Sequence, residues 1–349
     1  MSEPRTVLVT GDQGYVGSVL VRQLLDRGYQ VMGLDTGYFA QCALHTVGTE
    51  YRRITTDIRE VSAADLENIY AVIHLAALSN DPLGEVAPGL TEEINRDATV
   101  RLASMAKRAG VLRFIYSSSQ SMYGIARTGE ELDEDDSEKN AITAYARTKW
   151  EAEQRIKSLG DGAFTVVCMR PSTVFGVSPR LRCDIVFNNL VACAFTTGRI
   201  EIKSDGTPWR PVVHVRDVGS AFIAGLEAPP TLVVGRSYNV GIRNGNYRVR
   251  DLAEAAGRAV PGCTIVYTGE HGSDARTYRV SFARILSELG DWYKPEWDLD
   301  RGAQELVAFF KRIDLKEEDF RGRKTIRLAQ LKYLMAEGAI DHTLRWRHA

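Results

Sequence analysis

The sequence predicts an α/β fold, in which a doubly wound parallel sheet occupies the first half of the chain and a smaller lobe follows it. Three observations support this prediction. Short β-branched and apolar runs alternate with amphipathic helical segments as far as residue 170, which is typical of a parallel sheet with helices on both faces. The apolar residues of Ala71–Ala77 are adjacent, as expected of a strand buried on both faces. After Arg170 the alternation becomes irregular and prolines recur.

The elements of the first half follow one another at the spacing that crossover connections require. The predicted strands are Thr6–Thr10, Gln30–Asp35, Tyr51–Ile58, Ala71–Ala77, Phe114–Ser119 and Phe164–Arg170. The predicted helices are Ser18–Arg27, Thr91–Ala109 and Ala144–Leu159. Gly28 stands directly after the first helix, where a glycine in the left-handed conformation commonly ends a helix.

The length of the chain allows two domains of roughly 100–200 residues each. We expect a first domain at residues 1–170 and a second unit, mainly a lobe and a helical tail, at residues 171–349. Elements near residues 212–240 are expected to return to the first domain. The tail carries apolar residues at helical spacing, namely Leu328, Leu331, Leu334 and Met335. We expect this stripe to pack on the body of the protein or on a dimer partner.

The composition excludes several classes of protein. Of the 349 residues, 44 are Lys or Arg and 45 are Asp or Glu, so the net charge of −1 offers no basis for binding nucleic acid or an anionic membrane. The longest apolar run is too short to span a bilayer, and the N-terminus lacks the pattern of a signal peptide. The five cysteines show no metal-ligand or redox spacing. We therefore expect a cytoplasmic protein with free thiols and no metal site.

Thr10–Gly17 reads TGDQGYVG, with Gly11, Gly14 and Gly17 between a predicted strand and a predicted helix. Glycines at this turn let the backbone approach a pyrophosphate, which the helix N-terminus favours electrostatically. Asp35 ends the next strand, where a carboxylate accepts hydrogen bonds from the ribose hydroxyls of adenosine and repels a 2′-phosphate. No arginine follows it directly. The pattern predicts a Rossmann-type dinucleotide site that binds NAD rather than NADP.

Two later segments extend this predicted site. Asp57 and Ile58 end the third strand and could flank the adenine, although Asp57 alone could equally cap a helix. Leu75-Ala76-Ala77 ends the fourth strand and supplies small residues where the backbone of the dinucleotide must pass. Both segments fall at the carboxyl edge of the predicted sheet, where such folds bind their ligands.

Tyr145-Ala-Arg-Thr-Lys149 is the second strong signal. Residues four apart share one face of a helix, so the phenol and the ammonium point the same way. A phenol with a pKa of about 10 is a poor base at neutral pH, and a nearby positive charge favours its phenolate form. Ser117-Ser118-Ser119 ends the fifth strand, where a hydroxyl can orient a substrate hydroxyl and donate to a developing oxyanion. These residues form a candidate acid–base site.

In this order, the motifs resemble the extended short-chain dehydrogenase/reductase family, in particular its NAD-dependent nucleotide-sugar epimerase and dehydratase branch. The resemblance rests on the segments TGDQGYVGS, HLAALS, SSSQSMYG, YARTK, MRPSTVFG, Asn188-Asn189-Leu190 and WRPVVHVRDV. It implies that Tyr145 is the acid–base residue, with Lys149 as its partner and Ser119 as the catalytic serine. It also implies cofactor contacts at Gly11, Gly14, Tyr15, Val16, Gly17, Asp35, Asp57, Ile58, Leu75, Ala76, Ala77, Asn95, Tyr145 and Lys149.

The resemblance further implies that the C-terminal lobe binds a nucleotide-diphosphate sugar, in contact with Ser119. Asn189 and Arg210 match residues that contact the nucleotide in relatives, and an ordinary surface position is the alternative for each. Arg276 is a further candidate for a phosphate clamp, and a surface ion pair is equally consistent with it. We expect the protein to be a homodimer.

The residues after Ser119 separate the reactions of this branch. Dehydratases similar to this chain carry an Asp-Glu pair there and decarboxylases carry a Glu at the second position, whereas this chain has Gln120 and Ser121. The interpretation is an NAD-dependent epimerase that acts at C4 through a transient 4-keto sugar. Within enzymes, the alternative is a nucleotide-sugar 4-ketoreductase or 4,6-dehydratase of the same family. Outside enzymes, it is an NAD-sensing binding protein on the same fold.

Overall fold

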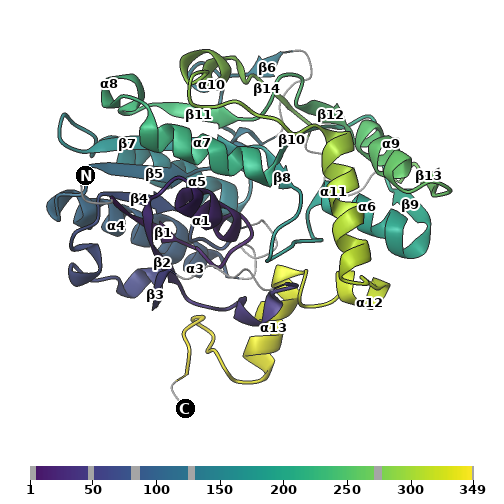
Figure 1. Cartoon of the computed structure of the whole chain (residues 1–349), viewed down its shortest axis with the longest axis horizontal. Coiled ribbons are helices and arrows are strands. Elements are labelled where there is room, and N and C mark those ends of the chain that lie inside the picture. The colour runs from purple at the N-terminus through teal and green to yellow at the C-terminus, as the bar shows by residue number, and fades with distance from the viewer. Residues whose placement is uncertain (1–4, 46–50, 80–86, 125–129, 271–276, 348–349) are drawn as a thin grey trace.

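The computed structural model describes residues 5–45, 51–79, 87–124, 130–270 and 277–347, and a seven-stranded parallel sheet lies at its centre (Figure 1). Its strands are β1 (Thr6–Thr10), β2 (Gln30–Asp35), β3 (Arg52–Thr55), β4 (Ala71–His74), β5 (Arg113–Ser117), β7 (Thr165–Pro171) and β11 (Ser237–Val240). They lie in the order β11-β7-β5-β4-β1-β2-β3. The order reverses between β1 and β4, which is the point where doubly wound folds bind their ligands.

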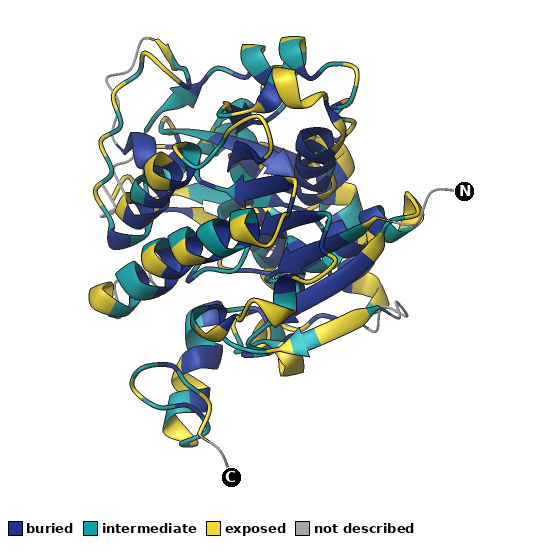
Figure 2. Cartoon of the chain, turned by 90° about the vertical axis from the view of Figure 1, so that its left-hand side faces the viewer, coloured by how far each residue is buried: buried dark blue, intermediate teal, exposed yellow. Residues whose placement is uncertain are grey.

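Helices cover both faces of this sheet. On one face lie α1 (Gly17–Asp26) and α7 (Val215–Glu227), and on the other lie α4 (Ala98–Arg108) and α5 (Ala144–Lys157). Successive residues of a strand point to opposite faces, so Val7 and Val9 join the core beneath α1 and α7, while Leu8 joins the opposite core. Figure 2 shows the buried residues concentrated in the strands and the exposed residues on the outer faces of the helices.

The predicted α/β class and the predicted strands of the first half are confirmed, with ends that differ by a few residues. The helix predicted over residues 91–109 is preceded by a helical turn, α3 (Pro88–Thr91), and contains a π-helical turn, η4 (Glu92–Asp97). Helix α1 ends just before Gly28, whose φ of +82° is the left-handed conformation expected of a glycine at that position.

Strand β11 comes from the second half of the chain and pairs with β7 at the edge of the central sheet. The other strand in the region near residues 212–240 does not join the central sheet, although its Val213 is buried in the same core as Val7 and Val9. This strand, β10 (Trp209–His214), pairs instead with β8 (Thr173–Phe175) and β12 (Asn246–Arg248). The remaining strands form pairs: β9 (Arg199–Ile202) with β13 (Thr264–Tyr267), and β6 (Glu131–Leu132) with β14 (Arg279–Val280).

The lobe packs around a core of its own, formed largely by three longer helices. These are α6 (Val186–Thr197), α9 (Val249–Ala259) and α11 (Leu299–Arg312). The shorter helices are α8 (Pro230–Val233), α10 (Ala283–Glu288) and α12 (Glu317–Phe320). Single helical turns are η1 (Ala40–Cys42), η2 (Ile58–Glu60), η3 (Ala64–Leu66) and η5 (Gln120–Tyr123).

The C-terminal helix α13 (Arg327–Ala336) lies beside the segment that follows β2, and its first residue also contacts the segment before α6 (Figure 1). Leu331 and Leu334 are buried in the same core as Leu8 and Leu34. The apolar stripe predicted in the tail therefore packs on the body of the protein, in the core on one face of the central sheet.

A buried ion pair fastens α5 to the sheet. The Nε of Arg170, on β7, donates to the two carboxylate oxygens of Glu153 at 3.2 and 3.1 Å, and the two side chains are 1% and 0% exposed. Ser237 on β11 donates to the same carboxylate at 2.7 Å. Burial opposes ionisation of Glu153, but the charge and hydrogen bonds of Arg170 outweigh it and lower the pKa of this carboxyl. The pair thus joins one helix to two strands.

Replacing Glu153 with alanine should lower the free energy of unfolding by about 3–5 kcal/mol, because Arg170 would become an unpaired buried charge. The double variant Glu153→Leu with Arg170→Met removes both charges and should regain part of that loss. Urea unfolding at pH 7, followed by circular dichroism, measures both variants. A double variant no more stable than Glu153→Ala would contradict this account of the pair.

Candidate functional site

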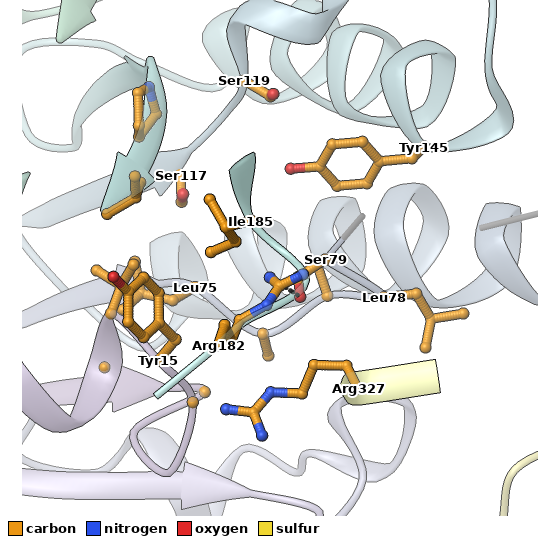
Figure 3. A pocket seen from close by; sticks show the side chains of 18 of the residues that line it. Tyr15, Leu75, Leu78, Ser79, Ser117, Ser119, Tyr145, Arg182, Ile185 and Arg327 are labelled. Atoms are coloured by element: carbon orange, nitrogen blue, oxygen red, sulfur yellow. Dashed lines mark hydrogen bonds between the residues drawn. The ribbon is translucent and has the colours of Figure 1, made fainter. Parts of the chain in front are cut away.

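A cavity of about 820 Å³ opens at the carboxyl ends of the central strands. One wall is formed by the residues that follow β1, β2, β4, β5 and β7, and the opposite wall by α6, the segment before it and the start of α13. Figure 3 shows side chains from both walls directed into it. A cavity of this size at the switch point of the sheet is the expected binding site of a doubly wound fold.

The turn between β1 and α1 requires its glycines. Gly11 has a φ of +76°, and a Cβ there would lie 2.8 Å from the backbone nitrogen of Ala76. A Cβ on Gly17 would collide with the carbonyl oxygen of Gly11. The turn therefore presents bare backbone and the N-terminus of α1 to the cavity, an arrangement that fits the pyrophosphate of a dinucleotide.

The structure brings nearly all of the predicted cofactor residues to this cavity. They are Gly11, Gly14, Tyr15, Val16, Gly17, Asp35, Asp57, Ile58, Leu75, Ala76, Ala77, Tyr145 and Lys149. Asn95 is the exception: it is buried away from the cavity, and its amide group bonds to the backbone of Leu78 at 2.8 and 3.1 Å. Its amide therefore positions the chain that follows β4, and its contact with the cofactor stays a prediction.

Asp35 stands at the end of β2 with its carboxylate at the cavity wall. The carboxylate accepts hydrogen bonds from the backbone nitrogens of Gly37 at 2.8 Å and Gln13 at 3.3 Å. Burial is the largest influence and raises the pKa of Asp35 to about 6, although these two bonds act in the opposite direction. A carboxylate so placed fits the two ribose hydroxyls of adenosine, whose donors would favour its charged form.

Two predicted cofactor residues have side chains that are already engaged. Asp57 accepts from the backbone nitrogen of Arg59 at 2.8 Å and from the Arg59 guanidinium at 2.6 and 2.9 Å, so it caps the turn η2 while it lines the cavity. The hydroxyl of Tyr15 donates to the carbonyl of Gly176 at 2.7 Å and accepts from Asn188 at 3.1 Å. Tyr15 thus faces the cavity with its ring and joins the cofactor turn to the lobe.

The candidate acid–base residues come from α5 and from the end of β5. Lys149 donates from Nζ to the carbonyl of Ser117 at 2.7 Å, and its Nζ lies 4.9 Å from the centre of the Tyr116 ring. Burial lowers the pKa of Lys149 to about 7. In Figure 3 the hydroxyl of Tyr145 points into the cavity, on the side where Ser119 lies.

Ser119 caps the start of the turn η5, and Ser121 restrains its side chain. Its Oγ accepts from the backbone nitrogen of Ser121 at 3.2 Å and lies 2.8 Å from the Ser121 hydroxyl. Gln120 uses its amide in the core, where Nε2 donates to the carbonyl of Arg170 at 3.0 Å and Oε1 accepts from Ser172 at 3.1 Å. Neither residue after Ser119 brings an acid or a base to the cavity.

The predicted substrate residues are only partly placed. Asn189 and Arg210 line the cavity. The amide of Asn189 donates to the carbonyl of Cys183 at 3.0 Å, and Arg210 donates to the carbonyl of Trp209 at 2.9 Å. Arg276 lies outside the described residues. The proposed contacts of all three with substrate stay predictions.

Sequence reasoning missed two arginines that line the cavity. Arg182 pairs with Asp184 at 2.8 and 3.1 Å and donates to Ser79 at 3.3 Å. Arg327 lies at the start of α13 and is 2% exposed. The run Pro179–Asp184 (PRLRCD) is a signal that could have identified Arg182. For Arg327 there is no local signal, because its place at the cavity depends on how the tail folds back.

Across the described part of the chain, no three His, Cys, Asp or Glu side chains are grouped to hold a metal ion. The same residues include no helix of the length and hydropathy needed to cross a membrane. All five cysteines are free thiols.

Comparisons with known proteins agree with this geometry. The model of the NAD dependent epimerase/dehydratase family matches residues 7–241. UDP-glucose 4-epimerase of Bacillus subtilis is 28% identical over 332 residues, which cover 86% of this chain and 94% of that protein. UDP-glucuronic acid decarboxylase 1 of Arabidopsis thaliana is 26% identical, over 90% of this chain and 72% of that protein.

Among solved structures, MoeE5 in complex with UDP-glucose and NAD is 29% identical, with a TM-score of 0.73 over 88% of this chain and 99% of that one. The family resemblance predicted from the motifs is thereby confirmed. Because the matched region spans both the glycine turn and the acid–base helix, the chain belongs to the NAD dependent epimerase/dehydratase family, and NAD is its cofactor.

Proposed function

We propose that this protein is an epimerase that inverts C4 of a nucleotide-diphosphate sugar through a transient 4-keto sugar. Bound NAD supplies the hydride acceptor and donor for that chemistry. The observation that supports this reaction most directly is an acid–base set without a neighbouring carboxylate. Tyr145, Lys149 and Ser119 line the cavity. The two residues after Ser119 are Gln120, whose amide bonds into the core, and Ser121, whose hydroxyl lies against that of Ser119. Relatives named UDP-glucose 4-epimerase, from Bacillus subtilis and Oryza sativa, support the same proposal.

In this reaction Tyr145 takes the proton of the C4 hydroxyl and later returns it. A cationic Lys149 stabilises the phenolate, and its pKa of about 7 lets it change charge near neutral pH. Ser119, whose orientation Ser121 restrains, donates a hydrogen bond to the sugar oxygen as it becomes a carbonyl. The asparagine and arginine on the lobe wall, Asn189 and Arg210, are proposed to contact the nucleotide diphosphate.

In the part of the chain that the structure describes, no carboxylate lines the cavity directly after Ser119, where the dehydratase alternative requires one. Elimination of water from the sugar needs a carboxylate acid or base beside the catalytic serine. Within the described residues, the carboxylates that line the cavity are Asp35, Asp57 and Asp184. Asp57 pairs with Arg59 and Asp184 pairs with Arg182, while Asp35 belongs to the proposed ribose site. A 4-ketoreductase needs no such carboxylate, so the residues of the cavity do not distinguish it from an epimerase. The products of the reaction do.

Several predictions from the sequence stay proposals. The division into a cofactor domain at residues 1–170, with elements near 212–240, and a lobe with a tail at 171–349 is one of them. A cytoplasmic homodimer is another, as is a role for Arg276 at the diphosphate.

Incubation with UDP-glucose and NAD should give a product of unchanged mass, because oxidation and reduction of the sugar occur within one turnover. Mass spectrometry and proton NMR of the product measure both mass and configuration at C4. The same assay extends to dTDP, GDP and CDP sugars if UDP-glucose is not converted. A product lighter by one water would indicate a dehydratase, and one heavier by two hydrogens, formed only with added reductant, a ketoreductase. NAD binding without conversion of any nucleotide sugar would favour the sensing protein.

Tyr145→Phe should reduce turnover by about 10²–10⁴, the usual effect of losing a general acid–base residue. NAD affinity should hardly change, since the ring stays in place. Tyr116→Phe is the matched control, because the Tyr116 hydroxyl has no hydrogen-bond partner within the described residues. Steady-state rates of the three proteins and NAD titrations measure the effect. Equal losses in both variants would show that Tyr145 is not the acid–base residue.

The affinity for NAD should fall as the pH is lowered through about 6, because the raised pKa of Asp35 means that its carboxyl then becomes neutral. The proton must leave before both ribose hydroxyls can donate, so the Kd should rise by up to about tenfold per pH unit below the pKa. Lys149 also titrates in this pH range, because its pKa is about 7. It loses its charge as the pH rises, whereas Asp35 loses its charge as the pH falls.

Asp35→Asn separates these two groups, because only Asp35 titration is removed. This variant should bind NAD more weakly at pH 7.5 and should lose the weakening below pH 6. Calorimetric titrations between pH 5 and 8 measure both proteins. An unchanged pH profile in Asp35→Asn would assign the effect to another group.

A further inference from the structure

Residues 327–347 lie across the turn that follows β2, beyond the region that the family model matches. Gln330 donates from Nε2 to the carbonyl of Tyr38 at 3.0 Å, and Trp346 donates from Nε1 to the carbonyl of Thr36 at 2.6 Å. Thr36 and Tyr38 also line the cavity. We call residues 327–347 the C-terminal strap, because they are bonded across the segment that forms the cavity wall at the end of β2.

Arg327 and Leu328 are the strap residues that line the cavity, and Arg327 is the charged one. Its guanidinium carbon lies 4.4 Å from the centre of the Phe39 ring, and Nη2 donates to the carbonyl of Arg180 at 2.7 Å. Its Nη1 is buried and has no hydrogen-bond partner within the described residues. Figure 3 shows the guanidinium extending into the cavity beneath Arg182. One terminal nitrogen of the guanidinium is therefore hydrogen-bonded, and the other has no partner among the described residues.

The surroundings of Arg327 carry an excess of positive charge. Arg180 and Arg182 also line or adjoin this wall, and Asp184 is already bonded to the fork of Arg182 at 2.8 and 3.1 Å. Burial, followed by the charge of Arg182, lowers the pKa of Arg327. A buried guanidinium with an unpaired edge costs free energy that an anion would recover. Within the described residues no carboxylate bonds to the Arg327 guanidinium, so this wall is suited to a bound anion.

We propose that Arg327 binds the diphosphate of NAD and that the strap exists to deliver this contact. The two N–H groups on one edge of a guanidinium match phosphate oxygens in spacing and charge. A dinucleotide with its ribose at Asp35 and its diphosphate at the glycine turn passes beside the segment that carries Phe39, on which Arg327 stacks.

The diphosphate of a nucleotide sugar carries the same charged oxygens as that of NAD, so a guanidinium recognises both in the same way. The position favours the cofactor, because Phe39 and the strap's anchors at Thr36 and Tyr38 follow Asp35 directly in the chain. The proposed substrate contacts, Asn189 and Arg210, lie instead on α6 and β10 and not beside the segment that follows β2. The inference rests on the NAD dependence of the family and stands whether or not the protein is an epimerase.

Calorimetric titration of the nucleotide-free full chain with NAD, ADP and adenosine tests the proposal without any activity assay. Arg327→Gln should weaken both NAD and ADP by about tenfold to a hundredfold, the usual range for a charge-assisted bond to phosphate. Adenosine, which has no phosphate, should bind as it does to the wild type. Lys332→Ala removes an exposed cation from the same helix and should bind all three ligands normally.

A titration of UDP into the NAD-saturated variant separates the two sources of diphosphate. Unchanged UDP affinity together with weakened ADP is the expected result. Weakened UDP with normal ADP would assign Arg327 to the substrate, and normal binding of both would assign it to packing of the strap. Either of these outcomes overturns the proposal.

Thermal unfolding of each variant shows whether the strap is still folded. Should Arg327→Gln not fold, Arg327→Lys keeps the charge and can still meet one phosphate oxygen but not two. Its expected loss is smaller, about threefold to tenfold for NAD and ADP, with none for adenosine. Equal affinity of Arg327→Lys and the wild type for ADP, at any salt concentration, would also overturn the proposal.

Discussion

The Arg170–Glu153 ion pair determines where helix α5 sits, and the acid–base site depends on that position. Tyr145, Lys149 and Glu153 recur every four residues, so they lie along one face of the helix. Because Arg170 fastens Glu153 to β7, the same face brings Lys149 to the carbonyl of Ser117. A buried ion pair adds little net stability relative to an apolar pair of the same size. We interpret this one as an orienting device, since it admits few other placements of α5.

A second set of buried contacts couples the cofactor turn to the lobe. Tyr15 bonds through its hydroxyl to Gly176 and Asn188, and its carbonyl accepts from Ser178 at 2.8 Å. Ser18, at the start of α1, lies 3.0 Å from Ser178 through their hydroxyl oxygens. Leaving one such group unpaired costs about 1–3 kcal/mol. These hydrogen bonds therefore hold the glycine turn against the first segment of the lobe, so the two walls of the cavity are joined directly.

The features predicted from the sequence are those that depend on neighbours along the chain: strand periodicity, the glycine turn, and the four-residue spacing of Tyr145 and Lys149. What could not be predicted depends on distant contacts. The side-chain amide of Gln120 is hydrogen-bonded in the core to Arg170 and Ser172, which lie 50 and 52 positions away. Arg327 enters the cavity through a contact 147 positions away. The bonds between the Asn95 amide and the backbone of Leu78 span 17 positions, and the sequence did not predict them.

Residues far apart in the chain share one core, since Leu331 and Leu344 are buried together with Leu8 and Leu34. During synthesis at about 5–20 residues per second, the early strands leave the ribosome on the order of 15–60 seconds before residue 331 is made. Throughout that interval the apolar surface beside β2 is not yet covered by Leu331 and Leu344, which bury it in the folded protein. Exposed surface of this kind attracts chaperones and promotes aggregation. The NAD-binding half can therefore begin to fold on the ribosome, but it completes its core only after translation has passed residue 344.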